Sequence, residues 1–164
     1  MEEKRYADCA FDEAVEKYAS VVLSTCLVYL KNLPDAEDCT QETFLKLYTK
    51  SPSLHDENHL RAWLLRVALN ECRHLVRDRR FHLPLEAAEN LSISSPEDKQ
   101  DISLLLMELP TKYREVMWLF YGLRYQSDEI ASILGKNPNT VRTLLRRGRE
   151  MLKNQLGGEN DERL

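Results

Sequence analysis

The most constraining stretch of this 164-residue chain is residues 126–149, which carries the signals of two short helices joined by a tight turn. Ser127 can cap the first helix, and the two acidic residues that follow it suit the positive end of the helix dipole. Gly135 is a plausible left-handed residue at the end of that helix. Asn137 can cap the second helix, whose first position suits Pro138. The segment therefore predicts a helix, a short turn and a second helix.

The second of these helices has two chemically different sides when its residues are stepped at about 100° each. Apolar or small residues gather on one broad side: Val141, Leu144, Leu145, Gly148, Met151 and Leu152. Basic residues form a stripe opposite: Arg142, Arg146, Arg149 and Lys153, flanked by Thr143 and Arg147. Guanidinium groups and a threonine hydroxyl are what a helix in the DNA major groove needs. A solvated basic face is the alternative, but the caps, the Gly turn and the stripe together favour a helix-turn-helix.

The rest of the chain also follows a helical period, and it lacks the alternation and the hairpin turns that indicate strands. We therefore predict an all-α protein. Helices are expected at residues 11–30, 35–50, 59–80 and 111–121, with a further helical segment from residue 102. Asp35 is expected to cap the second of these helices, after a turn at residues 32–35.

Residues 83–101 differ in composition and are interpreted as a flexible acidic linker, because they are rich in proline, serine and carboxylates. The linker divides the chain into two small helical domains at residues 1–82 and 102–156. A polar tail at residues 157–164 is expected to be disordered.

The net charge and the apolar runs of the chain argue against two classes of protein: non-specific nucleic-acid binders and membrane-spanning proteins. The formal net charge is −4, which argues against non-specific nucleic-acid binding by the whole protein but leaves room for a local basic face. The start of the chain has no signal-type apolar run, and the most apolar stretch, residues 21–30, is too short to cross a bilayer. We expect a cytoplasmic protein without membrane insertion.

The four cysteines are scattered along the sequence, at Cys9, Cys26, Cys39 and Cys72, and no pair is spaced as C-x-x-C. In a cytosolic chain they are expected to be reduced. A zinc site built from Cys72 and His74 with another pair fits no common spacing. No metal and no cofactor are expected.

Two polar helix faces are candidate binding surfaces. The expected helix at residues 59–80 is rich in arginine: Arg61, Arg66, Arg73, Arg77, Arg79 and Arg80. Set against Glu71 and Asp78, they leave a local charge of about +4, enough to neutralise several phosphates. A solvated charge run and a DNA contact explain this pattern equally well. The helix at residues 35–50 has a polar face formed by Asp38, Gln41, Glu42 and Leu45. Periodicity alone favours ordinary solvated surface there.

Several separate stretches, in order, resemble the motifs of bacterial sigma factors, and their spacing is similar to that of the small extracytoplasmic-function (ECF) class. Residues 35–45 are similar to the signature D-A-E-D-x-x-Q-E-T-F-L. Residues 60–70 resemble the segment F-R-x-W-L-x-R-I-A-x-N, with Leu60 in place of the first aromatic. Residues 109–116 and the helix-turn-helix resemble the C-terminal domain, although Gln126 stands where the family often has the capping Ser. The resemblance covers about residues 11–155.

The resemblance implies that the first domain is sigma region 2 and the second is sigma region 4. The first domain would dock on the β′ clamp helices of core RNA polymerase through Asp35, Asp38, Gln41, Glu42 and Leu45. It would bind the unpaired non-template strand of the promoter −10 element through Asn58, His59, Arg61, Arg66, Asn70, Arg73 and Arg77. The second domain would read the −35 element through Asn139, Thr140, Arg142, Thr143, Arg146, Arg147 and Arg149. It would also touch the polymerase β flap, and an anti-sigma factor is a further expected partner.

Sequence reasoning thus predicts a specificity subunit of RNA polymerase and not an enzyme. A stand-alone helix-turn-helix regulator is the alternative, but the D-A-E-D helix argues against it. The polar residues at positions 55–59 could also suggest an enzyme site, but a solvated loop explains them more simply. The sequence shows no nucleophile–base pairing, Gly-rich phosphate loop or metal-ligand cluster.

Overall fold

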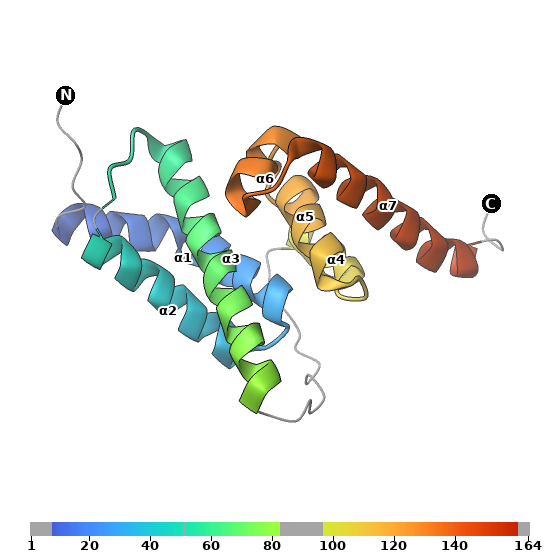
Figure 1. The fold of residues 1–164 in the computed structure, drawn as a ribbon, viewed down its shortest axis with the longest axis horizontal. Coiled ribbons are helices and arrows are strands. Elements are labelled where there is room, and N and C mark those ends of the chain that lie inside the picture. The colour runs from blue at the N-terminus through green and yellow to red at the C-terminus, as the bar shows by residue number, and fades with distance from the viewer. Residues whose placement is uncertain (1–7, 51, 83–96, 161–164) are drawn as a thin grey trace. The chain divides into compact units, whose positions relative to one another are not determined.

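The computed structural model describes residues 8–50, 52–82 and 97–160, and every regular element in these ranges is a helix (Figure 1). The prediction of an all-α protein is therefore confirmed. The elements are α1 (Asp8–Leu30), α2 (Leu33–Lys50), α3 (Glu57–His82), α4 (Glu97–Leu106), α5 (Thr111–Met117), the π-helical turn η1 (Trp118–Gly122), α6 (Ser127–Leu134) and α7 (Pro138–Asn160). The chain divides into two compact units after Ser92. No helix in the described ranges is long and apolar enough to cross a membrane.

Two helices of the second unit have bounds that differ from the predicted ones. Most of the predicted linker lies outside the described residues, but α4 begins at Glu97, five residues before the expected restart. The sequence there supplies carboxylates to the first turn of a helix, where the helix dipole favours them. The tail was expected to lose structure at residue 157, yet α7 continues to Asn160. Extending a helix that has already formed adds one hydrogen bond per residue and needs no new nucleus.

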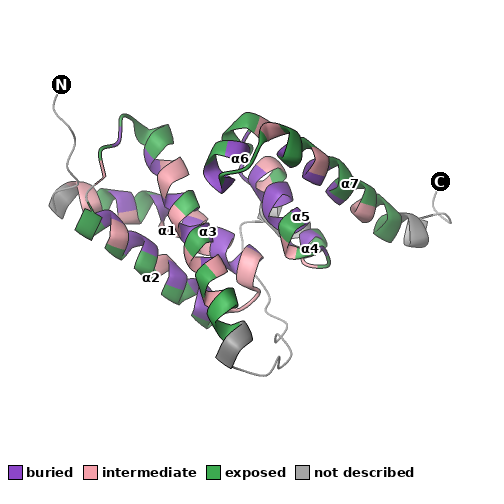
Figure 2. Ribbon diagram, viewed as in Figure 1, coloured by how far each residue is buried: buried purple, intermediate pink, exposed green. Residues whose placement is uncertain are grey.

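The first unit is a three-helix bundle in which α1, α2 and α3 each pack against the other two. Its innermost side chains come from all three helices, and Figure 2 shows buried residues recurring along each of them. The fully buried ones include Val22, Val28, Leu47, Leu60, Leu64, Leu65 and Leu69. Two buried threonines satisfy their hydroxyls within their own helices: Thr25 donates to the Val21 carbonyl and Thr43 to the Cys39 carbonyl, each at 2.7 Å.

The corner between α1 and α2 corrects the predicted cap. Lys31 adopts a left-handed conformation with φ of 58°, and its N–H donates to the Leu27 carbonyl at 2.8 Å. Asn32 then caps α2, because its Oδ1 accepts a hydrogen bond from the Asp35 N–H at 3.0 Å. Asp35 is therefore not the cap. The helix starts earlier than expected because Asn caps as well as Asp does, and Pro34 fits a first turn that needs no N–H from it.

The second unit contains the predicted helix-turn-helix, formed by α6 and α7. Gly135 ends α6 in the left-handed conformation, with φ of 64° and ψ of 36°. The Asn137 Oδ1 accepts from the Asn139 N–H at 2.9 Å, so Asn137 caps α7, which begins at Pro138. These predictions are confirmed. The cap of α6 is Gln126 instead of Ser127, because the Glu129 carboxylate accepts from the Gln126 N–H at 3.1 Å and closes a capping box.

The predicted helix at residues 111–121 ends differently from a regular α-helix. After Met117 the chain widens into the π-helical turn η1, and the Leu123 N–H donates to the Trp118 carbonyl at 3.0 Å. Gly122 faces the ring of buried Trp118, and a Cβ at this position would lie 2.5 Å from a ring carbon. Only glycine therefore fits here without displacing the indole.

Candidate nucleic-acid and polymerase interfaces

Helix α7 is buried on one side, as its periodicity predicts. Val141 and Leu145 are almost fully covered, and they pack with α6 and α5. Gly148 allows α7 to approach α5 closely, because a Cβ there would lie 3.1 Å from the Met117 side chain. This packing fixes the rotation of α7 about its axis and leaves its basic stripe facing outward.

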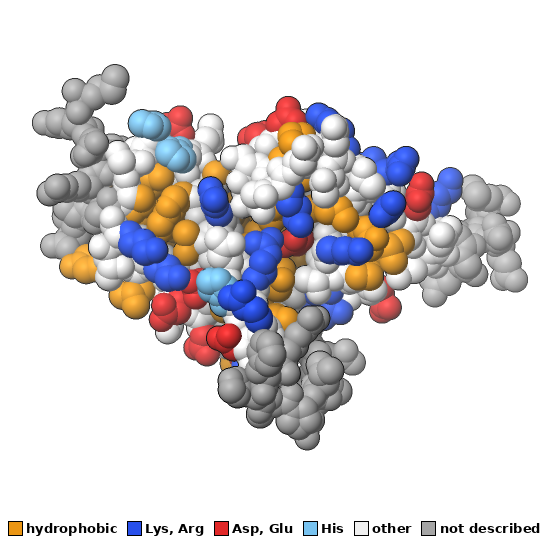
Figure 3. All heavy atoms as spheres, in the orientation of Figure 1, with side chains coloured by type: hydrophobic (Ala, Val, Ile, Leu, Met, Phe, Trp, Pro, Cys, Tyr) orange, Lys and Arg blue, Asp and Glu red, His pale blue; other side chains and the backbone are white. Residues whose placement is uncertain are grey.

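The predicted −35 residues lie on this outward side. Six are exposed: Asn139, Thr140, Arg142, Arg146, Arg147 and Arg149. Thr143 is half-buried and its hydroxyl donates to the Asn139 carbonyl at 3.0 Å. Figure 3 shows Lys and Arg side chains along the visible face of α7. The predicted stripe is thus one continuous surface of a helix whose opposite side is held by the core of the unit.

Arg142 makes two side-chain contacts within the helix-turn-helix. Its guanidinium donates to the Asn139 Oδ1 at 2.6 Å and to the Asp128 Oδ1 at 3.3 Å, so it bridges the first turns of α7 and α6. Both members of the Arg142–Asp128 pair are more than half exposed, and such pairs contribute little to stability. The Arg142 guanidinium is therefore exposed and can exchange the carboxylate for another acceptor.

The predicted −10 residues lie on α3. Asn58, His59, Arg66, Asn70 and Arg77 are exposed, while Arg61 and Arg73 are half-buried. Four of them form one stripe at helical spacing: Arg66, Asn70, Arg73 and Arg77. Within it, Arg73 donates to the Asn70 Oδ1 at 3.1 Å. The stripe is a polar, mostly basic surface along three turns of one rigid helix.

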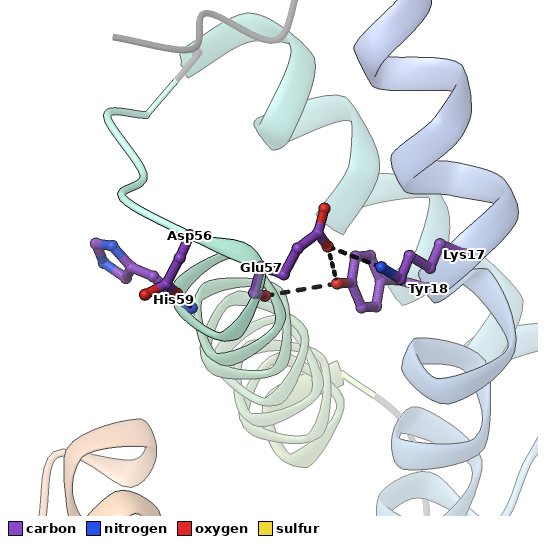
Figure 4. Close-up of polar contacts among 5 residues, drawn as sticks. All are labelled: Lys17, Tyr18, Asp56, Glu57 and His59. Carbon is purple, nitrogen blue, oxygen red and sulfur yellow. Dashed lines mark hydrogen bonds and ion pairs between the residues drawn. The ribbon is translucent and has the colours of Figure 1, made fainter. Parts of the chain in front are cut away.

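The start of α3 is tied to α1 (Figure 4). The Tyr18 hydroxyl donates to the Glu57 carboxylate in a short contact, and the Lys17 Nζ lies 3.2 Å from the same carboxylate. Asp56 caps the helix, because its Oδ1 accepts from the His59 N–H at 2.7 Å. In Figure 4 the His59 ring points away from Glu57. The contacts of Glu57 with Tyr18 and Lys17 therefore hold the first turn of α3, from which Asn58 and His59 project.

Hydrogen bonds and ring stacking also give structural roles to the polar residues at positions 55–59, which could have suggested an enzyme site. The His55 N–H donates to the His59 Nδ1 at 3.2 Å, and the two rings stack with their centroids 5.3 Å apart. Asp56 caps α3, and Glu57 links the start of α3 to Tyr18 and Lys17 of α1. Among the described residues, no group of three or more His, Cys, Asp or Glu side chains is arranged to hold a metal ion.

The predicted docking residues on α2 do not all share one environment. Four are exposed: Asp38, Gln41, Glu42 and Leu45. Asp35 is different. It is buried at the start of α2, and both of its carboxylate oxygens accept from the Arg79 guanidinium, with Nη2 to Oδ1 at 2.6 Å. This pairing raises the pKa of Arg79. Asp35 is therefore not part of the exposed face of α2 with the other four, and its carboxylate joins α2 to the end of α3.

Sequence reasoning missed Tyr48, which extends the exposed face of α2. Its side chain is half exposed, as is that of Leu45 three residues earlier, and its ring packs edge-on against Phe11 at 5.3 Å. Spacing of i+3 from Leu45 was the available signal, but Tyr48 lies beyond the motif. The exposed surface of α2 thus combines carboxylates with two large apolar side chains.

Comparison with known proteins identifies both units. The family described as Sigma-70 region 2 matches residues 14–82, and Sigma-70, region 4 matches residues 99–152. The chain is 32% identical to the ECF RNA polymerase sigma factor SigW of Bacillus subtilis (strain 168), over 90% of this chain and 89% of SigW. It is 29% identical to SigM of the same strain, over 92% and 98% of the two chains.

A solved structure shows the same fold. The sigma factor RpoE of Bartonella quintana, in complex with the anti-sigma factor NepR, superposes with a TM-score of 0.72 at 22% identity, covering 90% of this chain and 96% of that one. Region 2 precedes region 4 in this chain, and the identity to SigW extends over nearly the whole length of both proteins. The chain therefore belongs to the ECF sigma factors, non-enzymatic proteins that direct RNA polymerase to promoters for transcription initiation.

Proposed function

We propose that this sigma factor binds its partners through three surfaces: α7 binds the −35 element, α3 binds the −10 element, and α2 binds core polymerase. The observation that carries the proposal is the same in each case. A helix buried along one side presents, on its other side, the polar residues that the sigma-factor motifs single out. The side chains differ between the surfaces in charge and in apolar content, and these differences assign each surface to its partner.

The stripe on α7 fits duplex DNA. Arg142 is oriented by its contacts with Asn139 and Asp128, and its exposed guanidinium can offer a planar fork to a guanine. Arg146, Arg147 and Arg149 supply further positive charge along the same side for bases or phosphates. A thymine methyl or a base edge is the expected partner of Thr143.

The stripe on α3 fits a single strand. Its arginines can follow a phosphate backbone while Asn70 offers both donors and acceptors to an unpaired base. The exposed, stacked His55 and His59 lie at the start of the same helix, and unstacked bases pack on such rings. Trp63, the tryptophan of this helix, is half-buried. We therefore expect weak melting that depends on a well-matched promoter.

The surface of α2 fits a protein partner. Leu45 and Tyr48 are exposed apolar side chains, and Asp38 and Glu42 surround them with negative charge. A basic helical surface with an apolar centre is the complementary partner, and we propose the β′ clamp helices of core polymerase for this role. Region 4 is proposed to contact the β flap. RpoE was solved with an anti-sigma factor, and we propose a partner of that class for this chain as well.

Separate substitutions on two surfaces test the division of roles. We expect Arg142→Ala to weaken binding to the −35 element by about 1–3 kcal/mol, if the contact is a bidentate base contact, while affinity for core polymerase stays unchanged. Glu42→Lys should lower affinity for core polymerase without changing the thermal midpoint of the first unit. Both affinities can be measured by fluorescence anisotropy with labelled sigma factor and labelled promoter DNA. If either substitution altered both affinities equally, the assignment of one partner per surface would be wrong.

A further inference from the structure

The first turn of α6 places a carboxylate beside the basic stripe of α7. Asp128 and Glu129 both lie in this turn, but they make different contacts. The Glu129 carboxylate accepts from the Gln126 N–H and completes the capping box. The Asp128 carboxylate reaches the other helix, where its Oδ1 accepts from the Arg142 guanidinium at 3.3 Å. Glu129 therefore serves the fold, whereas Asp128 contacts a residue of the proposed −35 surface.

Stability of the fold does not explain the contact between Asp128 and Arg142. Both side chains are more than half exposed, and ion pairs between such exposed groups contribute little to stability. The carboxylate also lies beside a surface that has to approach the phosphates of DNA, which repel it. A negative charge in this place weakens DNA binding unless it serves recognition itself. The location and the partner of Asp128 thus point to a role in recognition.

Asp128 contacts one end of a guanidinium whose other end is held by α7. The Arg142 Nη1 donates to the Asn139 Oδ1 at 2.6 Å, and Nη2 donates to Asp128. Both acceptors lie in the first turns of helices that pack against each other. The first turn of α7 is in turn capped, because the Asn139 N–H donates to the Asn137 Oδ1 at 2.9 Å. A guanidinium has more N–H donors than these contacts use, so donors remain for a base.

We propose that Asp128 is a positioning residue that makes Arg142 select a guanine over a phosphate. The inference rests on the proposed binding of α7 to the −35 element. A guanine is uncharged and offers O6 and N7 to the remaining donors of the fork, so it can bind while Asp128 stays in place. A phosphate on the same guanidinium would lie within the Debye length of the carboxylate, about 8 Å at physiological salt, so their repulsion is only partly screened. Asp128 thus favours the base over the backbone as the partner of Arg142.

Holoenzyme made from core polymerase and the full chain tests this role. The template is a promoter that the holoenzyme uses in reconstituted transcription, with its −35 element randomised and its −10 element kept, and the retained templates are sequenced. Arg142→Ala should abolish base preference at one position, which identifies the base that Arg142 contacts. Asp128→Asn should lower the preference at that same position by about threefold or more. Asp128→Glu keeps the carboxylate and should restore part of the preference.

Two controls separate positioning from a general change in charge. Glu150 is exposed on α7, and Glu150→Gln removes the same charge as Asp128→Asn but should leave the preference at the identified position unchanged. In the Arg142→Ala background, Asp128→Asn should leave the remaining preferences unchanged, because its effect passes through Arg142. An equal loss in Glu150→Gln, or a loss in Asp128→Asn that is spread over all positions, would overturn the proposal.

The same library distinguishes failure of this proposal from failure of the proposed function. If Arg142→Ala removes the preference at one position and Asp128→Asn keeps it, Asp128 is not a positioning residue and the −35 role of α7 stands. If Arg142→Ala changes no single position, the base contact of Arg142 is wrong, and the role of Asp128 is wrong with it.

Discussion

The ion pair between Asp35 and Arg79 leads to a prediction about stability, because it joins Asp35 to the packed framework of the first unit and not to the exposed face of α2. Asp35→Asn keeps the size of the side chain and removes its charge, so the two hydrogen bonds from the Arg79 guanidinium lose their ionic acceptor. The buried end of α2 then no longer holds the last turns of α3. We expect the first unit to lose stability while its exposed surfaces keep their composition.

The magnitude follows from the exposure of the two partners. A buried pair that loses one member costs about 3–5 kcal/mol, whereas an exposed pair contributes about 0–1 kcal/mol. The Asp35 side chain is 9% exposed and that of Arg79 is 48% exposed. The guanidinium regains water when the carboxylate is removed, so the cost lies between these limits, at about 2 kcal/mol. For a unit of this size that corresponds to a fall of roughly 10 °C in the thermal midpoint.

Urea unfolding measures this cost in one unit at a time. Trp63 lies in the first unit and Trp118 in the second, so a Trp118→Phe background lets tryptophan fluorescence report the first unit alone. Asp38→Asn is the matched control: it makes the same chemical change at an exposed position of α2 and should shift stability by less than about 0.5 kcal/mol. Equal effects of the Asp35 and Asp38 substitutions would refute the reasoning. So would a loss of affinity for core polymerase by folded Asp35→Asn protein, because it would return Asp35 to the docking face.

Other predictions concern the second unit and the binding surfaces. Gly122→Ala should destabilise the second unit by about 1–3 kcal/mol, because the added Cβ meets the Trp118 ring at 2.5 Å; circular dichroism during heating measures this, and an unchanged midpoint would contradict it. An alanine at position 135 would meet no neighbouring atom but would have to adopt φ of 64°, so Gly135→Ala should destabilise the second unit by about 1 kcal/mol. A much larger loss of stability, or no loss, would contradict this. Binding to a panel of −35 variants should show Arg142→Ala losing discrimination at one base position, whereas a uniform loss would indicate a phosphate contact. Glu42→Lys should be rescued in part by raised concentrations of core polymerase in a transcription assay, and a defect that persists at saturation would argue against a docking role.

Local patterns predicted the parts of the fold that depend on neighbours in sequence. The left-handed Gly135 and the Asn137 cap follow from a few adjacent residues, and so does the two-sided character of α7. Gln126 and Ser127 could each cap α6, and the spacing of apolar residues does not distinguish between them. Glu129 lies three residues after Gln126 and selects it over Ser127.

The features that sequence reasoning missed join distant parts of the chain. Asp35 and Arg79 are 44 positions apart, and a motif that marks Asp35 as a docking residue carries no information about its burial. Cys26, Cys39 and Cys72 are far apart along the chain, and only the packing of three helices buries all three in the core of the first unit. The start of α4 at Glu97 was missed because the polar, acidic residues there are also typical of a linker.

Transcription by reconstituted polymerase tests the central claim most directly. Core RNA polymerase is combined with this purified protein on a library of genomic fragments, and the 5′ ends of the transcripts are sequenced. The account predicts starts at a defined set of positions that share −10 and −35 elements at constant spacing, all of them absent with core polymerase alone. A start profile indistinguishable from that of core polymerase alone would contradict it.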